Sequence, residues 1–272
     1  MSSKEIRAAL AEKLLAPMVI VMIVLAFVVG VLWQKVDFLQ KGTTATVAGT
    51  QTGTTATPAP APTISLSQIK DLFGKDLIKF GDGNRKVLFA EISDPSCPYC
   101  HAAGGENHSI AQNLGPNFKL VSDGGTYVAP VSEMRKLVDS GQASFVWIYY
   151  PGHGNGEMGT KALYCANEKG KFWDVHDLLM SDKGYDLLNN TVKNDKTQSG
   201  ALADFLKPAI DSNFLKGCLD SGKYDQRLGD DMTIAKSLNV QGTPGFFVNQ
   251  NVFPGAYSYT DLKSTVDAAL KS

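Results

Sequence analysis

Residues 86–101, KVLFAEISDPSCPYCH, decide the fold of this chain. The run from Lys86 to Ser93 is almost continuously apolar, which is typical of a strand buried on both faces of a sheet. Cys97 and Cys100 follow this run directly, and Pro98 between them suits the first turn of a helix, where its missing N–H costs nothing. A strand that leads into a CxxC helix indicates a redox-active dithiol.

The same residues, with His101 added, also match CxxCH, the pattern through which c-type haem is attached. Small c-type cytochromes are typically all-helical, whereas these cysteines follow a predicted buried strand, so the context disfavours haem. The sequence offers no second CxxC or HxxxH pattern for the remaining ligands of a zinc site. We therefore expect no metal and no cofactor, and a metal- or haem-delivery module is only an alternative.

Residues 1–63 have the composition of an anchor and a tether. No residue from Leu14 to Trp33 is charged, and twenty helical residues span about 30 Å, the thickness of a bilayer core. We predict a tail at 1–13, a single transmembrane anchor at 14–34 that contacts the lipid bilayer through residues 14–33, and a disordered Thr/Ala/Pro-rich linker at 35–63. The alternative is a cleaved signal peptide, whose apolar region would normally be shorter.

Charges that flank the apolar segment predict its orientation. The N-terminal flank carries Lys4, Arg7 and Lys13, and the other flank carries Lys35 and Lys41. This slight positive-inside bias predicts a cytoplasmic N-terminus and an extracytoplasmic domain on the cell membrane. The formal net charge of -1 gives no indication of a nucleic-acid partner.

The sequence pattern of residues 64–272 predicts one α/β domain. Residues 144–150, SFVWIYY, are strongly β-prone, and two short strands are expected after Val240. Helices are expected at 64–73, from the cysteines to about Asn113, at 131–140, across a helical block at about 155–238, and at the C-terminus. Together with the strand before the cysteines, this order is βαβ followed by ββα, which is a thioredoxin fold with a helical insertion.

Two features distant from the cysteines fit a dithiol. Thr243-Pro244 comes directly before the last two strands, and a proline between a loop and a strand is a natural place for a cis peptide. Glu91 puts a carboxyl group inside a strand that should be buried, where it would disfavour a nearby thiolate and move protons during redox chemistry. Asp94 is a second candidate for that task. The alternatives are an ordinary trans turn and a water-exposed Glu91.

These stretches together resemble the DsbA-like thiol-disulfide oxidoreductases of bacterial cell envelopes. The resemblance covers about residues 77–271 and rests on FAEISDPSCPYCH, KALYCANEKGKFWDVHDLL and VQGTPGFFV. It implies that Cys97 is the nucleophile, that Cys100 is the resolving cysteine, and that Pro244 is the cis-proline. It also places the chain in the bacterial envelope.

The resemblance implies further site residues. The backbone of Thr243 would pair with a bound peptide, and Glu91 would be the buried acid of the family. We expect Pro98, Tyr99 and His101, in or beside the motif, to contact substrate as well, although His101 can also be read as an ordinary helix residue. The Pro-Tyr dipeptide, which also occurs in glutaredoxins, and a long connection at 115–143 depart from the best-known members.

The remaining cysteines, Cys165 and Cys218, lie in the helical block. Some members of the family carry a second disulfide there, and an extracytoplasmic location permits one. The alternative is two free buried cysteines that act as small apolar side chains. The GxGxxG pattern at 154–159 lacks the following strand and acid of a dinucleotide site, so we interpret it as a loop.

The expected function is therefore that of a membrane-tethered, extracytoplasmic dithiol oxidase. Its partners would be proteins with thiols or disulfides and a membrane redox protein that recycles the dithiol. The sequence does not fix the direction of electron flow, so an isomerase, or a reductase for a dedicated partner, is the alternative.

Overall fold

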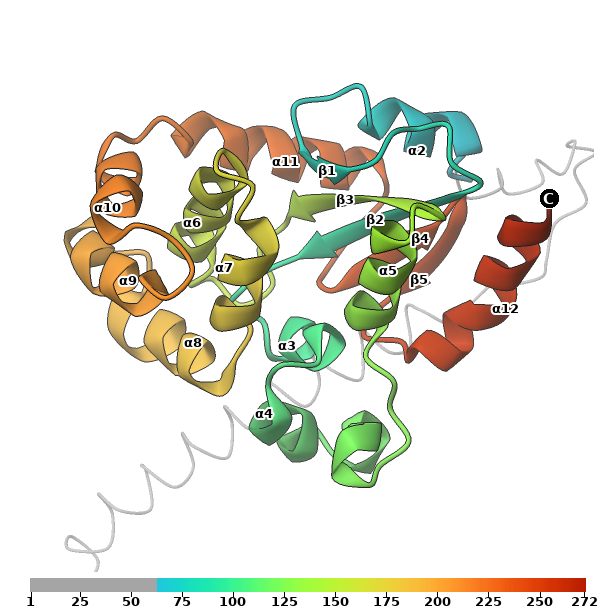
Figure 1. The fold of residues 1–272 in the computed structure, drawn as a ribbon, viewed down its shortest axis with the longest axis horizontal. Helices are drawn as coiled ribbons and strands as arrows, with labels where there is room; N and C mark the ends of the chain where they lie inside the picture. Colours follow the sequence, from blue (N-terminus) through green and yellow to red (C-terminus); the bar gives the residue numbers. More distant parts are fainter. Residues whose placement is uncertain (1–62) are drawn as a thin grey trace, which may run out of the picture. The chain divides into compact units, whose positions relative to one another are not determined.

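The computed structural model describes residues 63–272, and a five-stranded mixed sheet forms their centre (Figure 1). The strand order is β1-β3-β2-β4-β5. Only β2 and β3 run parallel; every other neighbouring pair is antiparallel. The strands are β1 (Ile78–Phe80), β2 (Val87–Ser93), β3 (Ala143–Tyr149), β4 (Gly245–Val248) and β5 (Asn251–Pro254). All residues of β2 and β3 are buried, as the apolar runs predicted.

Two helices cover one face of the sheet, α2 (Leu66–Leu72) and α11 (Asp225–Ser237). Helix α2 begins at Ser65, whose side chain accepts the N–H of Gln68 while the Gln68 side chain accepts the N–H of Ser65. The side chains of Leu88, Ala90 and Ile92 from β2 pack on this layer. Because side chains alternate along a strand, the other residues of β2 point to the opposite face.

The opposite face is covered by α5 (Pro130–Asp139), α12 (Tyr259–Lys271) and part of the helical insertion. Val87 and Phe89 of β2 pack there with Phe145 and Trp147 of β3. Glu91 and Ser93 belong to this same face of β2 by the alternation. The carboxyl group of Glu91 therefore lies within the larger apolar core of the protein.

The helical insertion lies between β3 and β4 and carries its own apolar core, continuous with that of the sheet. Its principal helices are α6 (Glu157–Asn167), α7 (Phe172–Leu179), α8 (Asp182–Asp186), α9 (Ser199–Leu206), α10 (Ser212–Asp220) and α11. A π-helix at Leu187–Val192 and a 3₁₀ turn at Lys196–Gln198 connect α8 to α9. This arrangement confirms the predicted thioredoxin fold with a helical insertion.

The helix after the cysteines differs from the prediction, because it does not continue to Asn113. Helix α3 (Pro98–Gly104) ends at Gly105, whose φ of 85° is left-handed and whose N–H donates to the carbonyl of His101. The next helix, α4 (His108–Asn113), has a separate N-cap at Asn107. A side chain at Gly105 would also collide with Ala129, so this turn requires glycine.

Strand β1 was not predicted, because three residues are too few to show a period. The predicted anchor at 14–34 and most of the linker at 35–63 lie outside the described residues. Within residues 63–272, none of the helices combines the length and the apolarity needed to span a membrane.

Candidate active site

Cys97 and Cys100 lie at the N-terminus of α3, directly after the loop that leaves β2. Cys97 is the N-cap residue, and Pro98 occupies the first helical position, as predicted. Both sulfurs are free thiols and both residues are buried, Cys97 to 3% exposure and Cys100 completely. The N–H of Asp94 donates to Cys100 Sγ at 3.5 Å.

The two thiols differ strongly in acidity. A hydrogen bond from the Cys100 thiol is the largest cause that lowers the pKa of Cys97, which falls to about 6 although burial opposes it. The Thr243 side chain and the backbone N–H groups of Tyr99 and Cys100 lower it further. Burial raises the pKa of Cys100 well above its ordinary value, and the neighbouring Cys97 adds to this effect. The pair thus holds one stabilised thiolate and one thiol that keeps its proton.

The loop before β4 lies against Cys97. The Thr243-Pro244 peptide is cis, and the carbonyl of Thr243 accepts a hydrogen bond from Cys97 Sγ at 3.5 Å. The structure therefore brings together the cysteine pair and the predicted cis-proline loop, which are far apart in the sequence.

A groove of about 350 Å³ begins at this loop and extends toward β5. Its lining consists of loop residues 239–243 together with Pro244, Gly245, Phe247, Val252, Pro254 and Gly255. Strand β5 forms an edge of the sheet and is largely exposed. An edge strand beside an apolar groove can accept an extended peptide through backbone hydrogen bonds.

Tyr99 is the exposed residue of the CxxC turn, with 44% of its surface accessible, and Pro98 is partly exposed. The Tyr99 ring meets Phe118 edge-on at a centroid distance of 5.5 Å, and Phe118 in turn lies 5.6 Å from Tyr127. Phe118 and Tyr127 belong to the long connection between α4 and α5. That connection therefore builds an aromatic surface beside the cysteines.

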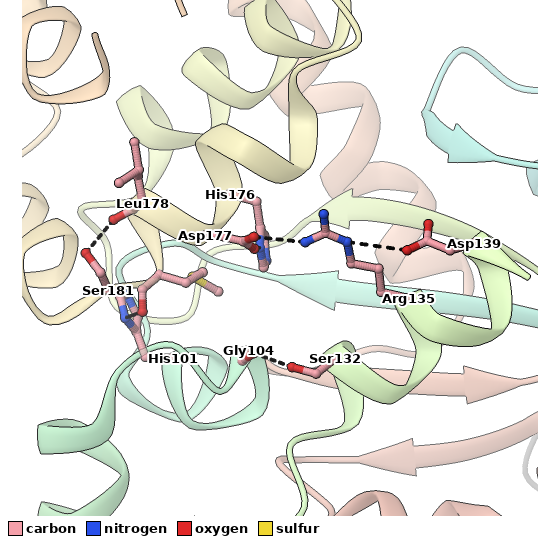
Figure 2. Close-up of polar contacts among 10 residues, drawn as sticks. His101, Gly104, Ser132, Arg135, Asp139, His176, Asp177, Leu178 and Ser181 are labelled. Atoms are coloured by element: carbon pink, nitrogen blue, oxygen red, sulfur yellow. Dashed lines mark hydrogen bonds and ion pairs between the residues drawn. The ribbon is translucent and has the colours of Figure 1, made fainter. Parts of the chain in front are cut away.

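His101 does not lie on this surface, contrary to the prediction that it contacts substrate. Its ring, labelled in Figure 2, is completely buried. Nδ1 lies 2.9 Å from the carbonyl of Met180, and Nε2 lies 2.8 Å from the carbonyl of Pro95. Burial lowers the pKa of His101 to about 4. The ring ties α3 to the loop before it and to the end of α7, which is a structural task.

Glu91 is completely buried in β2, and neither carboxyl oxygen has a hydrogen-bond partner among the described residues. Burial raises the pKa of Glu91, and the charge of His176 and the Ser93 hydroxyl oppose this only in part. Ser93 also lowers the pKa of Cys100. The Ser93 hydroxyl is itself buried without a hydrogen-bond partner among the described residues. Sequence reasoning missed Ser93, although the period of two along β2 puts it on the face of Glu91.

Asp94 organises the loops around the cysteines rather than serving as a free buried acid. Its Oδ2 accepts the N–H groups of Gly152 and His153 at 2.6 and 2.9 Å, and its Oδ1 accepts the N–H and hydroxyl of Ser96. A Cβ at Gly152 would lie 3.3 Å from Cys97 Sγ and would collide with Thr243 Oγ1. The backbone at Gly152 therefore forms a wall of the site, which the sequence did not reveal.

A disulfide joins Cys165 in α6 to Cys218 in α10. Within residues 63–272, the group of three side chains close enough to hold a metal ion is Cys165, Glu168 and Cys218. The disulfide occupies both of its sulfurs, so this group offers no thiolate ligand. The glycines of the GxGxxG pattern lie in the loop before α6 and at its first turn.

A family model described as thioredoxin matches residues 131–268. Disulfide bond formation protein D of Bacillus subtilis is 23% identical over 198 residues, covering 70% of this chain and 76% of that protein. The Na(+)/H(+) antiporter NhaA 3 of Salinispora tropica is 26% identical over 199 residues, covering 71% of this chain. The chain spans only 24% of that antiporter's length.

The oxidised form of BdbD from Bacillus subtilis is a solved structure with the same fold. It aligns with a TM-score of 0.51 and 19% sequence identity, covering 77% of this chain and 97% of that one. The family match spans half of the chain, and it includes β3, the helical insertion and the cis-proline loop. The chain belongs to the thioredoxin family.

Proposed function

We propose that this protein is a dithiol oxidase that introduces disulfides into folding proteins outside the cytoplasm. The difference in acidity between Cys97 and Cys100 carries the proposal. A thiolate at Cys97 that is stable near neutral pH stabilises the reduced form of the pair. A dithiol with a stabilised reduced form is a strong oxidant, because its disulfide is readily given up to substrate thiols.

The reaction would start with a substrate thiolate that attacks Cys97 Sγ of the Cys97–Cys100 disulfide. Cys100 leaves and takes up a proton, because burial favours its neutral form. The second thiolate of the substrate then attacks the mixed disulfide, and Cys97 leaves as a stable thiolate. The substrate gains a disulfide, and the enzyme gains two electrons that a membrane redox partner would remove.

The groove and the edge strand β5 support an extended polypeptide as substrate. The carbonyl of Thr243 lies beside Cys97, where it can accept a backbone N–H of a peptide held for exchange. The exposed Tyr99 and the partly buried Phe118 add an aromatic surface next to the cysteine pair. Apolar side chains next to a cysteine would favour binding, and such side chains are exposed in proteins that have not yet folded.

Membrane attachment is part of the proposal and rests on the apolar residues 14–33. The tether of about thirty residues that follows would let the domain reach substrates at a distance from the bilayer. The cell membrane, with the catalytic domain on the extracytoplasmic side, is the proposed location. Oxidising conditions there are compatible with the disulfide between Cys165 and Cys218.

The reduction potential of the Cys97–Cys100 pair tests the proposal. The full chain, purified in detergent, would be equilibrated with glutathione buffers and its free thiols counted by mass after alkylation. A parallel sample with Cys165→Ala and Cys218→Ala isolates the catalytic pair. A potential near about −120 mV supports an oxidase, whereas one near about −270 mV would establish a reductase instead. If the Cys97–Cys100 pair showed no reversible redox couple and the protein held a metal or gave a haem absorbance band, the proposal that it is a thiol-disulfide enzyme would be wrong.

A further inference from the structure

The loop at 151–156, between β3 and α6, lies beside Cys97 and contains the start of the GxGxxG pattern, for which the exchange reaction has no task so far. Gly152 forms a wall of the site, because a Cβ there would lie 3.3 Å from Cys97 Sγ. Gly156 of the pattern allows an equally close approach, because a Cβ there would collide with the Asp94 carboxyl group. The loop is therefore fitted closely against the segment that leads to the cysteines.

Asn189 joins this loop to the residue before Cys97. It lies in the π-helix Leu187–Val192 of the insertion, and it is partly buried. Its Nδ2 donates to the carbonyl of Ser96 at 3.2 Å, and its Oδ1 accepts a hydrogen bond from Asn155 Nδ2 at 3.1 Å. One amide group thus connects the insertion with both segments that surround Cys97.

The partners of the Asn189 amide fix its orientation. Nδ2 donates a second hydrogen bond, at 3.1 Å, to the carbonyl of Tyr185 in the preceding turn. Carbonyl oxygens accept hydrogen bonds but do not donate them, so a flipped amide would turn its own oxygen toward two acceptors. All three hydrogen bonds form in one arrangement only, which is what a side chain needs in order to position its neighbours.

A second asparagine holds the same loop from the end of the π-helix. Asn194 Nδ2 donates to the carbonyl of Gly154 at 2.8 Å, and its Oδ1 accepts the N–H of Met158 at 3.2 Å. Asn194 has a φ of 61° and follows Lys193 with a φ of 43°, and such left-handed conformations are uncommon for residues with a side chain. Both π-helices and strained backbone are frequent at functional sites. The backbone of this segment thus indicates a task beyond connecting two helices.

The carbonyl of Ser96 matters because it belongs to the peptide bond that leads into Cys97. A peptide bond is planar, so the direction of this carbonyl also sets the direction in which Cys97 continues the chain. The Ser96 hydroxyl accepts the N–H of Asn155 at 3.2 Å, so the loop and this peptide are joined directly as well as through Asn189. Cys97 is only 3% exposed, and its surroundings therefore decide from which direction another sulfur can approach.

We propose that Asn189 is a positioning residue for thiol-disulfide exchange, which holds the Ser96–Cys97 peptide and the loop at 151–156 so that a substrate sulfur can reach Cys97 in line with the Cys97–Cys100 bond. It acts through Ser96 and Asn155. The helical insertion thereby takes part in the reaction. This inference rests on the proposed function, because it concerns the same exchange at Cys97, but it holds for either direction of electron flow.

Two reactions of Cys97 test the proposal, because one depends on alignment and the other on access. In the first, the oxidised full chain in detergent is reduced by dithiothreitol, whose thiolate must attack the disulfide at Cys97. A misplacement of about 1 Å can cost about a hundredfold in rate, so we expect Asn189→Ala to slow this reduction by about tenfold.

In the second reaction, iodoacetamide alkylates the reduced chain at about pH 8, where Cys97, with a pKa of about 6, is a thiolate. Cys100 keeps its proton, so the mass added to the protein reports on Cys97. We expect Asn189→Ala to speed this alkylation about twofold or more, because the wall at Gly152 is held less firmly and Cys97 becomes more accessible.

Asn190 provides the matched control, because it is the next residue of the same π-helix. Its side chain is exposed and donates to Asp186 at 2.6 Å. Asn190→Ala removes the same chemical group from the same helix and should keep both rates of the parent. A merely structural role of Asn189 would lower the free energy of unfolding in urea without changing the two rates of the folded protein in opposite directions.

Two further variants keep the test valid if Asn189→Ala does not fold. Asn189→Asp keeps the shape of the side chain and the acceptor for Asn155 but puts an oxygen opposite the carbonyl of Ser96, so it should slow the reduction about as much as the alanine variant. Asn155→Ala releases the loop alone, so it should speed the alkylation while slowing the reduction less.

A reduction rate in Asn189→Asp equal to that of the parent would overturn the positioning role. Equal slowing of reduction and alkylation in Asn189→Ala, or the same changes in Asn190→Ala, would overturn it too. These results would leave the exchange reaction itself intact. If the parent chain shows no reversible Cys97–Cys100 couple at all, the proposed function fails instead, so the two failures are distinguishable.

Discussion

The N–H of Gly152 donates a 2.6 Å hydrogen bond to Oδ2 of Asp94 and so ties the loop after β3 to the loop after β2. The two strands are parallel neighbours, so their carboxyl ends meet at one edge of the sheet. The same carboxyl group holds Ser96, which precedes the first cysteine. Asp94 thus fixes the distance between Cys97 and the backbone wall at Gly152.

Replacing Asp94 by Asn should destabilise the protein by about 3 kcal/mol. An amide keeps one acceptor oxygen, so about two buried hydrogen bonds to a charged group would be lost, each worth roughly 1.5 kcal/mol or more. Unfolding in urea, followed by tryptophan fluorescence, measures this change. Asp230→Asn, at an acid bonded to Gln226 on the surface of α11, is the control and should change stability by less than about 0.5 kcal/mol.

Removal of the Cys100 thiol should make Cys97 less acidic. The Cys100 hydrogen bond is the largest cause of the low Cys97 pKa, so in Cys100→Ala that pKa should rise from about 6 toward its ordinary value of 9.0. The rate at which iodoacetamide alkylates Cys97, measured as a function of pH, gives the midpoint of the Cys97 titration. Thr243→Val should shift the midpoint in the same direction by a smaller amount. An unchanged midpoint in Cys100→Ala would show that another group stabilises the thiolate.

Glu91→Gln should flatten the pH dependence of stability. Because the pKa of Glu91 is raised by folding, the folded state keeps a proton that the unfolded chain releases above its ordinary pKa of 4.5. This stabilisation is complete below pH 4.5 and is lost as the pH rises through the folded pKa. The Gln variant should therefore match the parent near pH 4.5 and exceed its free energy of unfolding at pH 8. The free energy of unfolding would be measured by urea titration at each pH. If it changed with pH to the same extent in both proteins, Glu91 would not be a buried neutral acid.

Loss of the disulfide between Cys165 and Cys218 should cost about 4 kcal/mol. The bond closes a loop with a sequence separation of 53, and the chain-entropy model gives this value for the unfolded state. The double Ala variant and the parent would be compared by urea unfolding, both with the catalytic pair reduced. The pKa of Cys97 should not change, because the disulfide lies in the insertion. A shifted alkylation midpoint would mean that the insertion also tunes the active site.

Tyr99→Ala should weaken the binding of protein substrates without affecting small ones. The exposed ring contacts Phe118, so its loss removes apolar binding surface. We expect KM to rise several-fold for a reduced unfolded protein, with little change in the rate constant for dithiothreitol. Tyr257→Ala, at an exposed tyrosine that follows β5 and contacts Phe253 within that strand, tests how far the surface extends. If Tyr99→Ala slowed the reaction with dithiothreitol as much as the reaction with the protein substrate, Tyr99 would act in the exchange reaction itself.

The central part of the fold could be predicted because its signals are local. The apolar run at 86–93 allows no arrangement other than a strand covered on both faces, and CxxC with a proline marks the start of a helix. The resemblance to a known family then connected Pro244 to the cysteines, a relation that no local pattern provides. Gly105 was overlooked as the end of α3 because a second glycine precedes it and the polar residues that follow can also continue a helix.

The less predictable parts of the site depend on contacts between distant segments. His101 was expected at the surface because it follows the motif, yet its position on α3 points it at the carbonyls of Pro95 and Met180. Gly152 appeared as an ordinary loop glycine until its contact with Cys97 was seen.

The hydrogen bond between Cys97 and Thr243 joins residues separated by 146 positions along the chain. During synthesis the two cysteines emerge long before the loop that lies against them, and the whole insertion is made in between. A growing chain, or one cut short before residue 243, has the dithiol and the start of α3 but lacks the Thr243 contacts that lower the pKa of Cys97. The segment that contains Thr243 thus completes the surroundings of Cys97 after the cysteine pair and the start of α3 have been made.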